Sequence, residues 1–594
     1  MDNALNGMKI CLVVSNPSQF PDMVQFAKMT SNAGAKPAFF FNNQGHFGRE
    51  DFIFSLNDLC FESFELRDLK LVKLTPIPSV PNNPPLDSTS SLPQKKEVPG
   101  DNIVGSISGK ENTLQNLSTL KKFSKSLKKQ LPFLVVLYDL LLKVRSALSP
   151  YRIYHNGLRS YYEFKRTYYD LKASYNHRHT IKNRFKVFLI ELIWSVTSYL
   201  AALVAIKVYR HWKDIALVYG EFLDLEKPKL LIFAEDSVDY LTPELVRESK
   251  KRNIPSVVFP YSLANEREFI AGAVECDRFV RNLGLYKIIR FFWPRWIRPY
   301  KGQDVLKSEP YFVIAAQLRG VAPPNPWVMN SGQSNCIAVD SEAMFEYYRK
   351  SGIPSKQMQI TGYPSNDELA LGRIESLKTR EKLRELGLIK SITSPLAICA
   401  LPVRQASRAL NEFEDHDSFL NFYVNNLKEH LKGWEIVYKI HPRQSKAETE
   451  ELKEKFGIRG APMDTTLLIP AGNLYLAAVS ATIRWALACG IPAINYDVYN
   501  YCYDDFDTAN GVTTVFYKKP FIETLVQHNS PEYLAQKTQV ALSESKHWGS
   551  IDGYSQGRIA TLFKSLILKQ DYTESALAPI AQKNSNSKLS GISI

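Results

Sequence analysis

The sequence predicts an α/β protein made of two doubly wound domains, each built on a parallel sheet. Short apolar runs typical of buried strands alternate with longer stretches of helical periodicity, which is the pattern of parallel sheets covered by helices. Polar or proline-containing turns end many of these runs. The turn at 362–367, Gly-Tyr-Pro-Ser-Asn-Asp, separates a first series of runs from a second. Because 594 residues suit roughly two to four domains, two such sheets are the simplest architecture.

The first series opens with a β-α-β unit. Its first run, 8–14, ends in the polar turn 15–17, and a helical pattern then leads to the apolar run 37–41. After a long interruption, further strands are expected at 229–234, 256–259, 311–316, 336–339 and 359–361, with a helix at 243–251. The second series predicts strands at 396–400, 435–440, 467–469, 474–479 and 493–496.

The interruption has two parts of different composition. Residues 76–118 contain seven prolines together with Ser, Asn and Gly and show no apolar period, which indicates an exposed linker. Residues 119–214 are basic and aromatic, and we expect a helical insertion there. The predicted organisation is 1–75 and 215–375 for the N-terminal domain, 76–118 for the linker, 119–214 for the insertion, 376–570 for the C-terminal domain and 571–594 for a disordered tail.

The net charge of the chain is concentrated in this insertion. From Lys121 to Asp214 there are 19 Lys or Arg and five acidic residues, which equals the net charge of +14 of the whole chain. The same 94 residues include 17 aromatic residues, whereas the overall 12% predicts about 11. A second patch, 278–301, holds seven basic residues, no acidic residue and seven aromatic ones. Both segments predict a surface for an anionic partner.

We expect that partner to be a membrane rather than a nucleic acid. The apolar run 187–206 is about long enough to span a bilayer, but Glu191 interrupts it and basic residues flank both ends. A helix lying in the interface, a re-entrant hairpin and a buried helix all stay open. Clusters of Arg with Trp suit anionic headgroups. No RNP, KH or C2H2 spacing indicates a nucleic-acid module.

The cysteines and the first residues bear on the compartment. Seven scattered cysteines with no C-x-x-C pair suggest neither a disulfide framework nor a zinc site, which fits a reducing cytoplasm. The run 8–14 is too short for a signal peptide and has no basic residues before it. We therefore expect a cytoplasmic protein attached to the inner face of the plasma membrane.

The clearest local motif lies at 474–496, where a strand, a Ser-Ala-Thr turn, a helix, a Cys-Gly-Ile-Pro stop and a second strand follow one another. Ser480 is a good N-cap, and a helix N-terminus at the end of a strand is an anion site. An ordinary capped unit without a ligand has the same sequence features. The segment Lys439-Ile-His-Pro-Arg443 adds a His and two cations at the end of a neighbouring strand. Arg404 either joins this cluster or lies in a solvated loop.

These residues resemble a family. The His-Pro at a strand end, the Ser/Thr turn and the following Ala-Leu-Ala-Cys-Gly-Ile-Pro look like the C-terminal half of GT-B glycosyltransferases of bacterial capsule and lipopolysaccharide synthesis. Sialyl- and Kdo-transferase-like groups are similar, and glycerophosphotransferases of teichoic acid synthesis show a related pattern. The resemblance implies that His441, Ser480 and Thr482 hold the phosphate of a nucleotide-sugar donor. It also implies a glycan or lipid-linked acceptor.

The same resemblance implies that an acid of the N-terminal domain, Glu235 or Asp236, is the general base. A carboxylate within hydrogen-bond reach can take the proton of an attacking acceptor hydroxyl, and we favour Asp236. Capping of the next helix by both acids is an equal alternative. Lys439, His441 and Arg443 would stabilise the departing nucleotide, so neither a metal nor a cofactor is expected. The D-x-D at 505–507 follows no apolar strand, and we interpret it as chance.

Two further functions stay open. The segments Val339-Asp-Ser-Glu342 and Ile360-Thr-Gly-Tyr-Pro364 resemble the middle of nonhydrolysing UDP-N-acetylglucosamine 2-epimerases, which share the GT-B fold. An epimerase acts on a soluble nucleotide sugar and gains nothing from a basic aromatic surface. The third candidate is a membrane-associated GT-B scaffold without catalysis, which would bind no nucleotide.

Overall fold

A computed structural model gives the fold. It describes residues 5–15, 19–42, 204–262, 266–276, 278–280, 284–330, 332–402, 404, 410–441 and 444–569, and the backbone of 62–67, 70–74 and 181–203. The chain forms two compact units, 79–195 and the remainder. The elements described below belong to the larger unit. The helix α7 (Ile181–Glu226) has its first residues, 181–195, in the other unit.

The N-terminal domain is built on a sheet of eight strands. In chain order they are β1 (Lys9–Val14), β2 (Lys36–Phe41), β3 (Glu62–Arg67), β4 (Lys70–Leu74), β5 (Leu230–Phe233), β6 (Ser256–Val258), β9 (Cys336–Val339) and β10 (Met358–Ile360). Their order across the sheet is β10-β9-β6-β5-β1-β2-β3-β4, and β4 alone among them is antiparallel to its neighbour. The six strands from β3 to β9 follow the Rossmann order, so the strand order reverses between β1 and β5.

Helices cover both faces of this sheet because successive side chains of each strand point to opposite faces. On β1, Leu12 lies in the core under α1 (Phe20–Asn32), and Val13 lies in the opposite core. That opposite core is closed by α7, α8 (Thr242–Lys251) and α12 (Glu342–Lys350). A strand buried on both faces has to be apolar throughout, which explains the sequence Lys-Ile-Cys-Leu-Val-Val of β1.

The C-terminal domain has a sheet of five parallel strands. They are β11 (Leu396–Ala400), β12 (Glu435–Lys439), β13 (Leu474–Ala477), β14 (Ala493–Tyr496) and β15 (Val512–Val515), in the order β12-β11-β13-β14-β15. The reversal point lies between β11 and β13. One face is covered by α15 (His416–His430), α16 (Lys446–Phe456) and α19 (Lys518–His528). The other is covered by α13 (Pro364–Ile374), α14 (Ser376–Glu385), α17 (Thr465–Leu468), α18 (Ile483–Ala488) and α20 (Pro531–Trp548).

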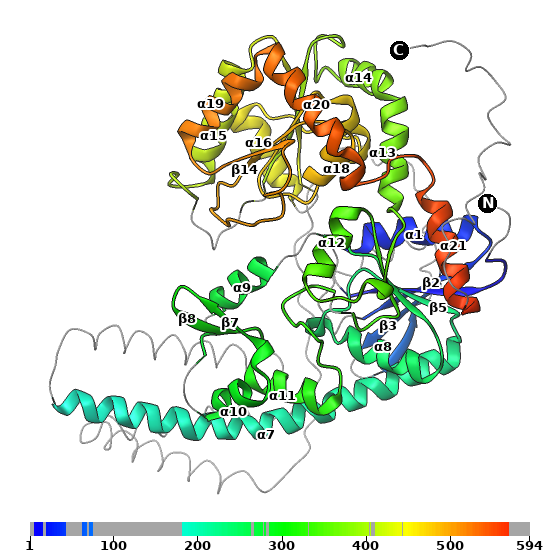
Figure 1. The fold of residues 1–594 in the computed structure, drawn as a ribbon, viewed down its shortest axis with the longest axis vertical. Helices are drawn as coiled ribbons and strands as arrows, with labels where there is room; N and C mark the ends of the chain where they lie inside the picture. Colours follow the sequence, from blue (N-terminus) through cyan, green and yellow to red (C-terminus); the bar gives the residue numbers. More distant parts are fainter. Residues whose placement is uncertain are drawn as a thin grey trace, which may run out of the picture. The chain divides into compact units, whose positions relative to one another are not determined.

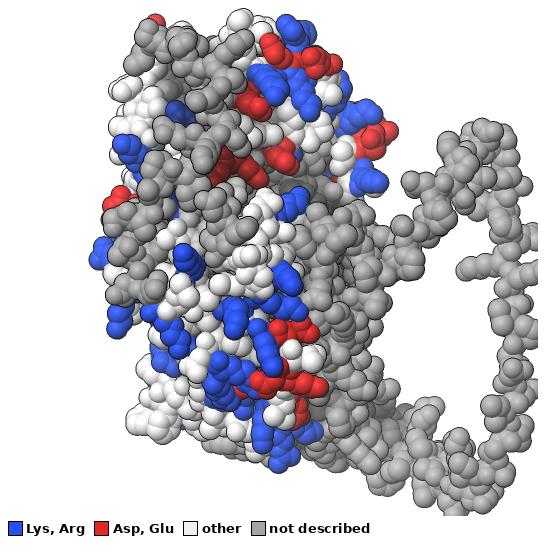
Figure 2. Space-filling view, turned by 90° about the vertical axis from the view of Figure 1, so that its right-hand side faces the viewer, with Lys and Arg blue, Asp and Glu red and all other residues white. Residues whose placement is uncertain are grey.

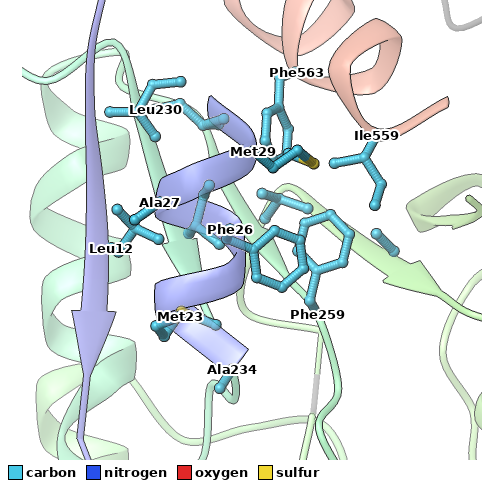
Figure 3. Close-up of a cluster of buried hydrophobic side chains, with 14 of the residues drawn as sticks. Leu12, Met23, Phe26, Ala27, Met29, Leu230, Ala234, Phe259, Ile559 and Phe563 are labelled. Atoms are coloured by element: carbon cyan, nitrogen blue, oxygen red, sulfur yellow. The ribbon is translucent and has the colours of Figure 1, made fainter. Parts of the chain in front are cut away.

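The last helix, α21 (Ser555–Leu568), returns to the N-terminal domain and lies near α1 (Figure 1). Its Phe563 packs 5.8 Å from Phe259, measured between ring centroids, and Phe259 in turn lies 4.4 Å from Phe26 of α1 (Figure 3). The predicted C-terminal domain, 376–570, therefore extends too far, because α21 is part of the first core. The predicted GT-B fold, with two Rossmann-like doubly wound domains, is confirmed.

A small subdomain precedes β9 and packs on α7. It consists of α9 (Glu266–Glu275), α10 (Gly284–Phe292), the hairpin β7 (Ile297–Tyr300) with β8 (Gln303–Leu306), and α11 (Pro310–Arg319). Trp212 of α7 shares a core with Tyr286, Ile289 and Trp296. Within the part of the chain that the structure describes, no helix is both long and apolar enough to cross a membrane.

Two strand predictions were wrong. Residues 311–316 lie in α11, because Pro310 occupies its first turn and Gly320 ends it in the left-handed conformation. Residues 467–469 lie in α17 and the short 3-10 turn that follows. Both segments are short apolar runs, which periodicity alone assigns to neither class. The predictions for the linker 76–118, most of the insertion 119–214 and the tail 571–594 lie outside the described residues.

Among the described residues, positive and negative side chains are mixed on the surface. On the face drawn in Figure 2, Lys and Arg side chains lie beside Asp and Glu side chains in several places. This agrees with the sequence, in which the residues outside 121–214 carry no net charge.

Candidate functional site

The first half of the candidate site is a buried polar cluster at the reversal point of the N-terminal sheet. Ser15 follows β1, Glu235 follows β5 after one residue, and Gln19 precedes α1. The Gln19 side chain joins the two strands, since its Nε2 donates to Glu235 Oε1 at 2.6 Å and its Oε1 accepts from the Ser15 amide at 2.8 Å. All three residues are buried. Ligands of doubly wound sheets bind where the strand order reverses, which is the position of Glu235.

The surroundings of Glu235 favour its protonated form. Burial raises the pKa of Glu235 to about 8, and the nearby carboxylates of Asp239 and Asp236 act in the same direction. The Lys307 ammonium opposes the shift and is held 2.8 Å from Asp239 Oδ2. A carboxyl group with a pKa near the working pH can both accept and release a proton.

Asp236, the favoured base from sequence, is held by backbone hydrogen bonds. Its side chain is fully buried, and Oδ2 accepts hydrogen bonds from the amides of Gln333 and Ser334 at 2.9 and 3.1 Å. Its own amide donates to Asn330 Oδ1. These bonds fix the segment before β9 to the end of β5. Of the two adjacent acids, the geometry favours Glu235 for proton transfer.

The second half of the candidate site lies at the reversal point of the C-terminal sheet, between β11 and β13. Arg404 is four residues beyond β11, and its guanidinium pairs with Asp417 of α15 at 2.5 Å and approaches Glu451 of α16 at 3.9 Å. These two carboxylates already neutralise it. Of the two alternatives left open by sequence, the structure favours the loop arginine over the anion ligand.

Three hydroxyl groups form a chain after β13. The Oγ1 atom of Thr482 lies 2.7 Å from Ser480 Oγ and 2.6 Å from the buried Tyr475 hydroxyl. The predicted N-cap was Ser480, but α18 begins at Ile483 with Thr482 as N-cap and without a side-chain cap. The first amides of α18 already donate to carbonyls, Ile483 to Ser480 and Arg484 to Ala481. The polar atoms offered to a ligand here are therefore hydroxyl groups rather than helix amides.

The turn that carries these hydroxyls has a strained backbone. Val479 has a φ of 48°, a left-handed conformation that is unusual for a β-branched residue. Asn495 on β14 is buried and holds this turn, because its Oδ1 accepts from the Val479 amide at 2.8 Å. Strain of this kind concentrates at functional sites.

Removal of this support has a measurable cost. We expect Asn495→Ala to lower the free energy of unfolding by about 1–3 kcal/mol, because the Val479 amide loses its acceptor. Urea unfolding measures the change. Asn425→Ala, on the exposed side of α15, is the control and is expected to change the free energy by less than about 0.5 kcal/mol. An equal effect of the two substitutions would contradict the role of Asn495.

The cations predicted beside this turn are only partly available. Lys439 ends β12 and donates to the Met463 carbonyl at 2.5 Å, and burial lowers its pKa. His441 lies two residues further, partly buried, and its amide donates to Gln444 Oε1. Ala400 of β11 pairs with both Lys439 and Ala477, so the ends of β12 and β13 are two strand spacings apart, about 10 Å. Arg443 lies outside the described residues.

A buried ion pair joins the two domains next to these ends. Arg484 of α18 lies 2.9 Å from Asp340, which directly follows β9, and both side chains are almost fully buried. Ser341, the next residue, caps α12 by accepting from the Met344 amide. The motif that resembles the epimerases thus supplies an interdomain ion pair and a helix cap. Arg484 and Gln19 were both missed from sequence, since one lies in an apolar helix and the other before one.

The D-x-D at 505–507 shows no metal-binding arrangement. Phe506 is buried and packs against Trp548. Among the described residues, no group of three or more His, Cys, Asp or Glu side chains is placed to hold a metal ion.

Comparisons with known proteins give distant similarities only. No family model matches the chain, and no curated protein matches it significantly. A UDP-GlcNAc 2-epimerase from Neisseria meningitidis bound to UDP-GlcNAc is 15% identical, covering 59% of this chain and 82% of that one, with a TM-score of 0.35. A variant of the wall teichoic acid polymerase TagF is 12% identical, covering 57% of this chain and 74% of that one, with a TM-score of 0.37. The calicheamicin glycosyltransferase CalG4 is 11% identical, covering 63% of this chain and 84% of that one, with a TM-score of 0.35. Because these values are low, we infer function from the residues of this chain.

Proposed function

We propose that this chain is a glycosyltransferase that moves a sugar from a nucleotide-activated donor to a glycan or lipid-linked acceptor at the cytoplasmic face of a bacterial membrane. The observation that carries the proposal is Glu235, a carboxyl group with a raised pKa at the reversal point of the N-terminal sheet. The hydroxyl turn at the reversal point of the other sheet supplies a second polar cluster. The roles in bacterial capsule or lipopolysaccharide synthesis belong to the same proposal.

The proposed reaction needs one base and one site for the departing phosphate. Ionised Glu235 accepts the proton of the acceptor hydroxyl, whose oxygen forms a bond to the anomeric carbon of the donor sugar. The bond from that carbon to the phosphate oxygen breaks, and the nucleotide leaves with the electron pair. Ser480, Thr482 and His441 donate hydrogen bonds to the phosphate, and Arg443 and Lys439 supply positive charge. No step requires a metal ion or a cofactor.

Nucleotide binding tests the donor half. A nucleotide that binds the folded protein raises its melting temperature, and at a hundredfold excess over Kd the stabilisation is about 2.7 kcal/mol. In a thermal-shift screen of CMP, CDP, UDP and GDP we expect one of them to raise the melting temperature. The rise should be lost in His441→Ala and in Ser480→Ala/Thr482→Val. Thr393→Val, an exposed residue before β11 at the opposite end of the strand, should retain it.

The outcomes separate the three functions. Stabilisation by CMP points to a sialic-acid or Kdo-type donor. Conversion of UDP-N-acetylglucosamine in the absence of any acceptor would identify an epimerase instead. Failure of all four nucleotides to stabilise the chain would refute the transferase and favour the scaffold without catalysis.

A further inference from the structure

The helix α10 carries buried apolar side chains and, toward its C-terminal end, exposed ones. Leu285, Tyr286 and Ile289 are buried in the core shared with α7 and α11. Phe291 and Phe292, at the end of the same helix, are 79% and 64% exposed, and Ile288 is 37% exposed. The rings of Phe291 and Phe292 lie 4.9 Å apart, edge to face, so they form one apolar tip. The buried side chains account for the packing of the helix on the core, and among the described residues the rings of the tip contact only each other and Trp293.

The segment that carries the tip is rich in cations. From Gly284 to Asp304 the chain has five Lys or Arg and one acidic residue. Arg290 pairs with Asp304 and Arg298 pairs with Glu266. For Lys287, Arg295 and Lys301, all exposed, the described residues provide no carboxylate partner. Two exposed aromatic rings, in a segment with cations that have no carboxylate partner among the described residues, suit a partner that is both apolar and anionic.

From this geometry we infer that Phe291 and Phe292 insert into the interfacial region of an anionic lipid bilayer, with Lys287, Arg295 and Lys301 on the headgroups. Apolar burial and attraction to anionic lipid are the two contributions to interfacial binding. Exposed apolar area of this kind marks an interaction surface. The inference corrects the sequence-based patch at 278–301, because Tyr286 and Trp296 are buried and unavailable to lipid. It goes beyond the proposed reaction, since binding to a bilayer requires no donor.

Vesicle sedimentation without nucleotide tests the inference on the full chain. We expect Phe291→Ser/Phe292→Ser to weaken binding to vesicles of phosphatidylcholine with phosphatidylglycerol about tenfold, and the loss should persist at high salt. Lys287→Gln/Arg295→Gln should weaken binding mainly at low salt, because salt screens exposed charges. Ile374→Ser/Leu377→Ser, which removes two other exposed apolar side chains, at 83% and 58%, is the matched control and should leave binding unchanged.

Three results would overturn the inference. The first is unchanged vesicle binding by Phe291→Ser/Phe292→Ser. The second is a change from dimer to monomer in this variant without vesicles, which would make the tip an interface between copies of the chain. The third is a loss of RNA binding by this variant while its vesicle binding stays intact. Because none of these measurements uses a nucleotide, failure of the proposed transfer reaction would leave the inference standing.

Discussion

Glu235→Gln should slow sugar transfer by orders of magnitude while leaving the fold intact. A positioned general base typically contributes a factor of about 10²–10⁴ to the rate, and glutamine cannot accept the proton. The amide is close to the carboxyl group in size and can still accept from Gln19, so the cluster at the ends of β1 and β5 stays formed. The measurement is kcat for transfer to an acceptor, with nucleotide binding by thermal shift as the check on folding.

The pH dependence of the wild-type enzyme should carry the signature of the same group. Because only the ionised carboxylate accepts a proton, kcat/KM should rise with pH and level off above the pKa of Glu235, about 8. Stability should change in the opposite direction. Between pH 4.5, the ordinary pKa, and about 8 the unfolded chain has lost a proton that the folded chain retains, so the free energy of unfolding falls as pH rises.

Glu235→Gln should remove that loss of stability. We expect the variant to be more stable than the wild type at pH 8, by on the order of 3 kcal/mol, and equal to it near pH 4. Asp236→Asn is the control, and it should lose stability at both values, because its carboxylate accepts two backbone amides. If Glu235→Gln turns over as fast as the wild type, another residue accepts the proton, and the main support for the proposed reaction is lost.

The strands could be predicted where sequence and burial agree. The strands β9 and β11 are apolar at every position because helices cover both faces of the sheet, and their bounds match the predicted ones. The run 311–316 is equally apolar but lies in a helix. It was predicted as a strand because it covers too few residues for a helical period to be recognised. The strands β3 and β4 are rich in charged residues and have no apolar run longer than two residues, so they were not predicted.

For the candidate site, the sequence predicted only which polar residues lie at the ends of strands. Glu235, His441 and Ser480 were found because each follows an apolar strand, and parallel strands bring their carboxyl ends to one edge. Which of two adjacent acids carries the chemistry depends on partners far away in sequence. Gln19, 216 residues before Glu235, and the amides at 333 and 334 decide between Glu235 and Asp236. No local pattern contains such pairings.

Arg484→Met should destabilise the protein by about 3–5 kcal/mol, because removal of one partner leaves Asp340 buried without a counter-charge. The contact is electrostatic: Nη1 lies 2.9 Å from the carboxylate but at an angle unsuited to a hydrogen bond, and Nε has no acceptor among the described residues. Burial raises the pKa of Asp22 on α1 to about 7, and Arg484 opposes this shift. The substitution should therefore raise the pKa of Asp22 further. Chemical unfolding at pH 8 measures the loss.

A double substitution separates the charge from the packing. Arg484→Met/Asp340→Leu removes both buried charges and should recover most of the stability that Arg484→Met loses, since a buried ion pair and an apolar pair of similar volume are often equivalent. Lys378→Met breaks an exposed pair with Glu375 and should cost less than about 1 kcal/mol. If the double variant is no more stable than the single one, the arginine stabilises the domain junction by packing, and the ion pair with Asp340 contributes nothing to it.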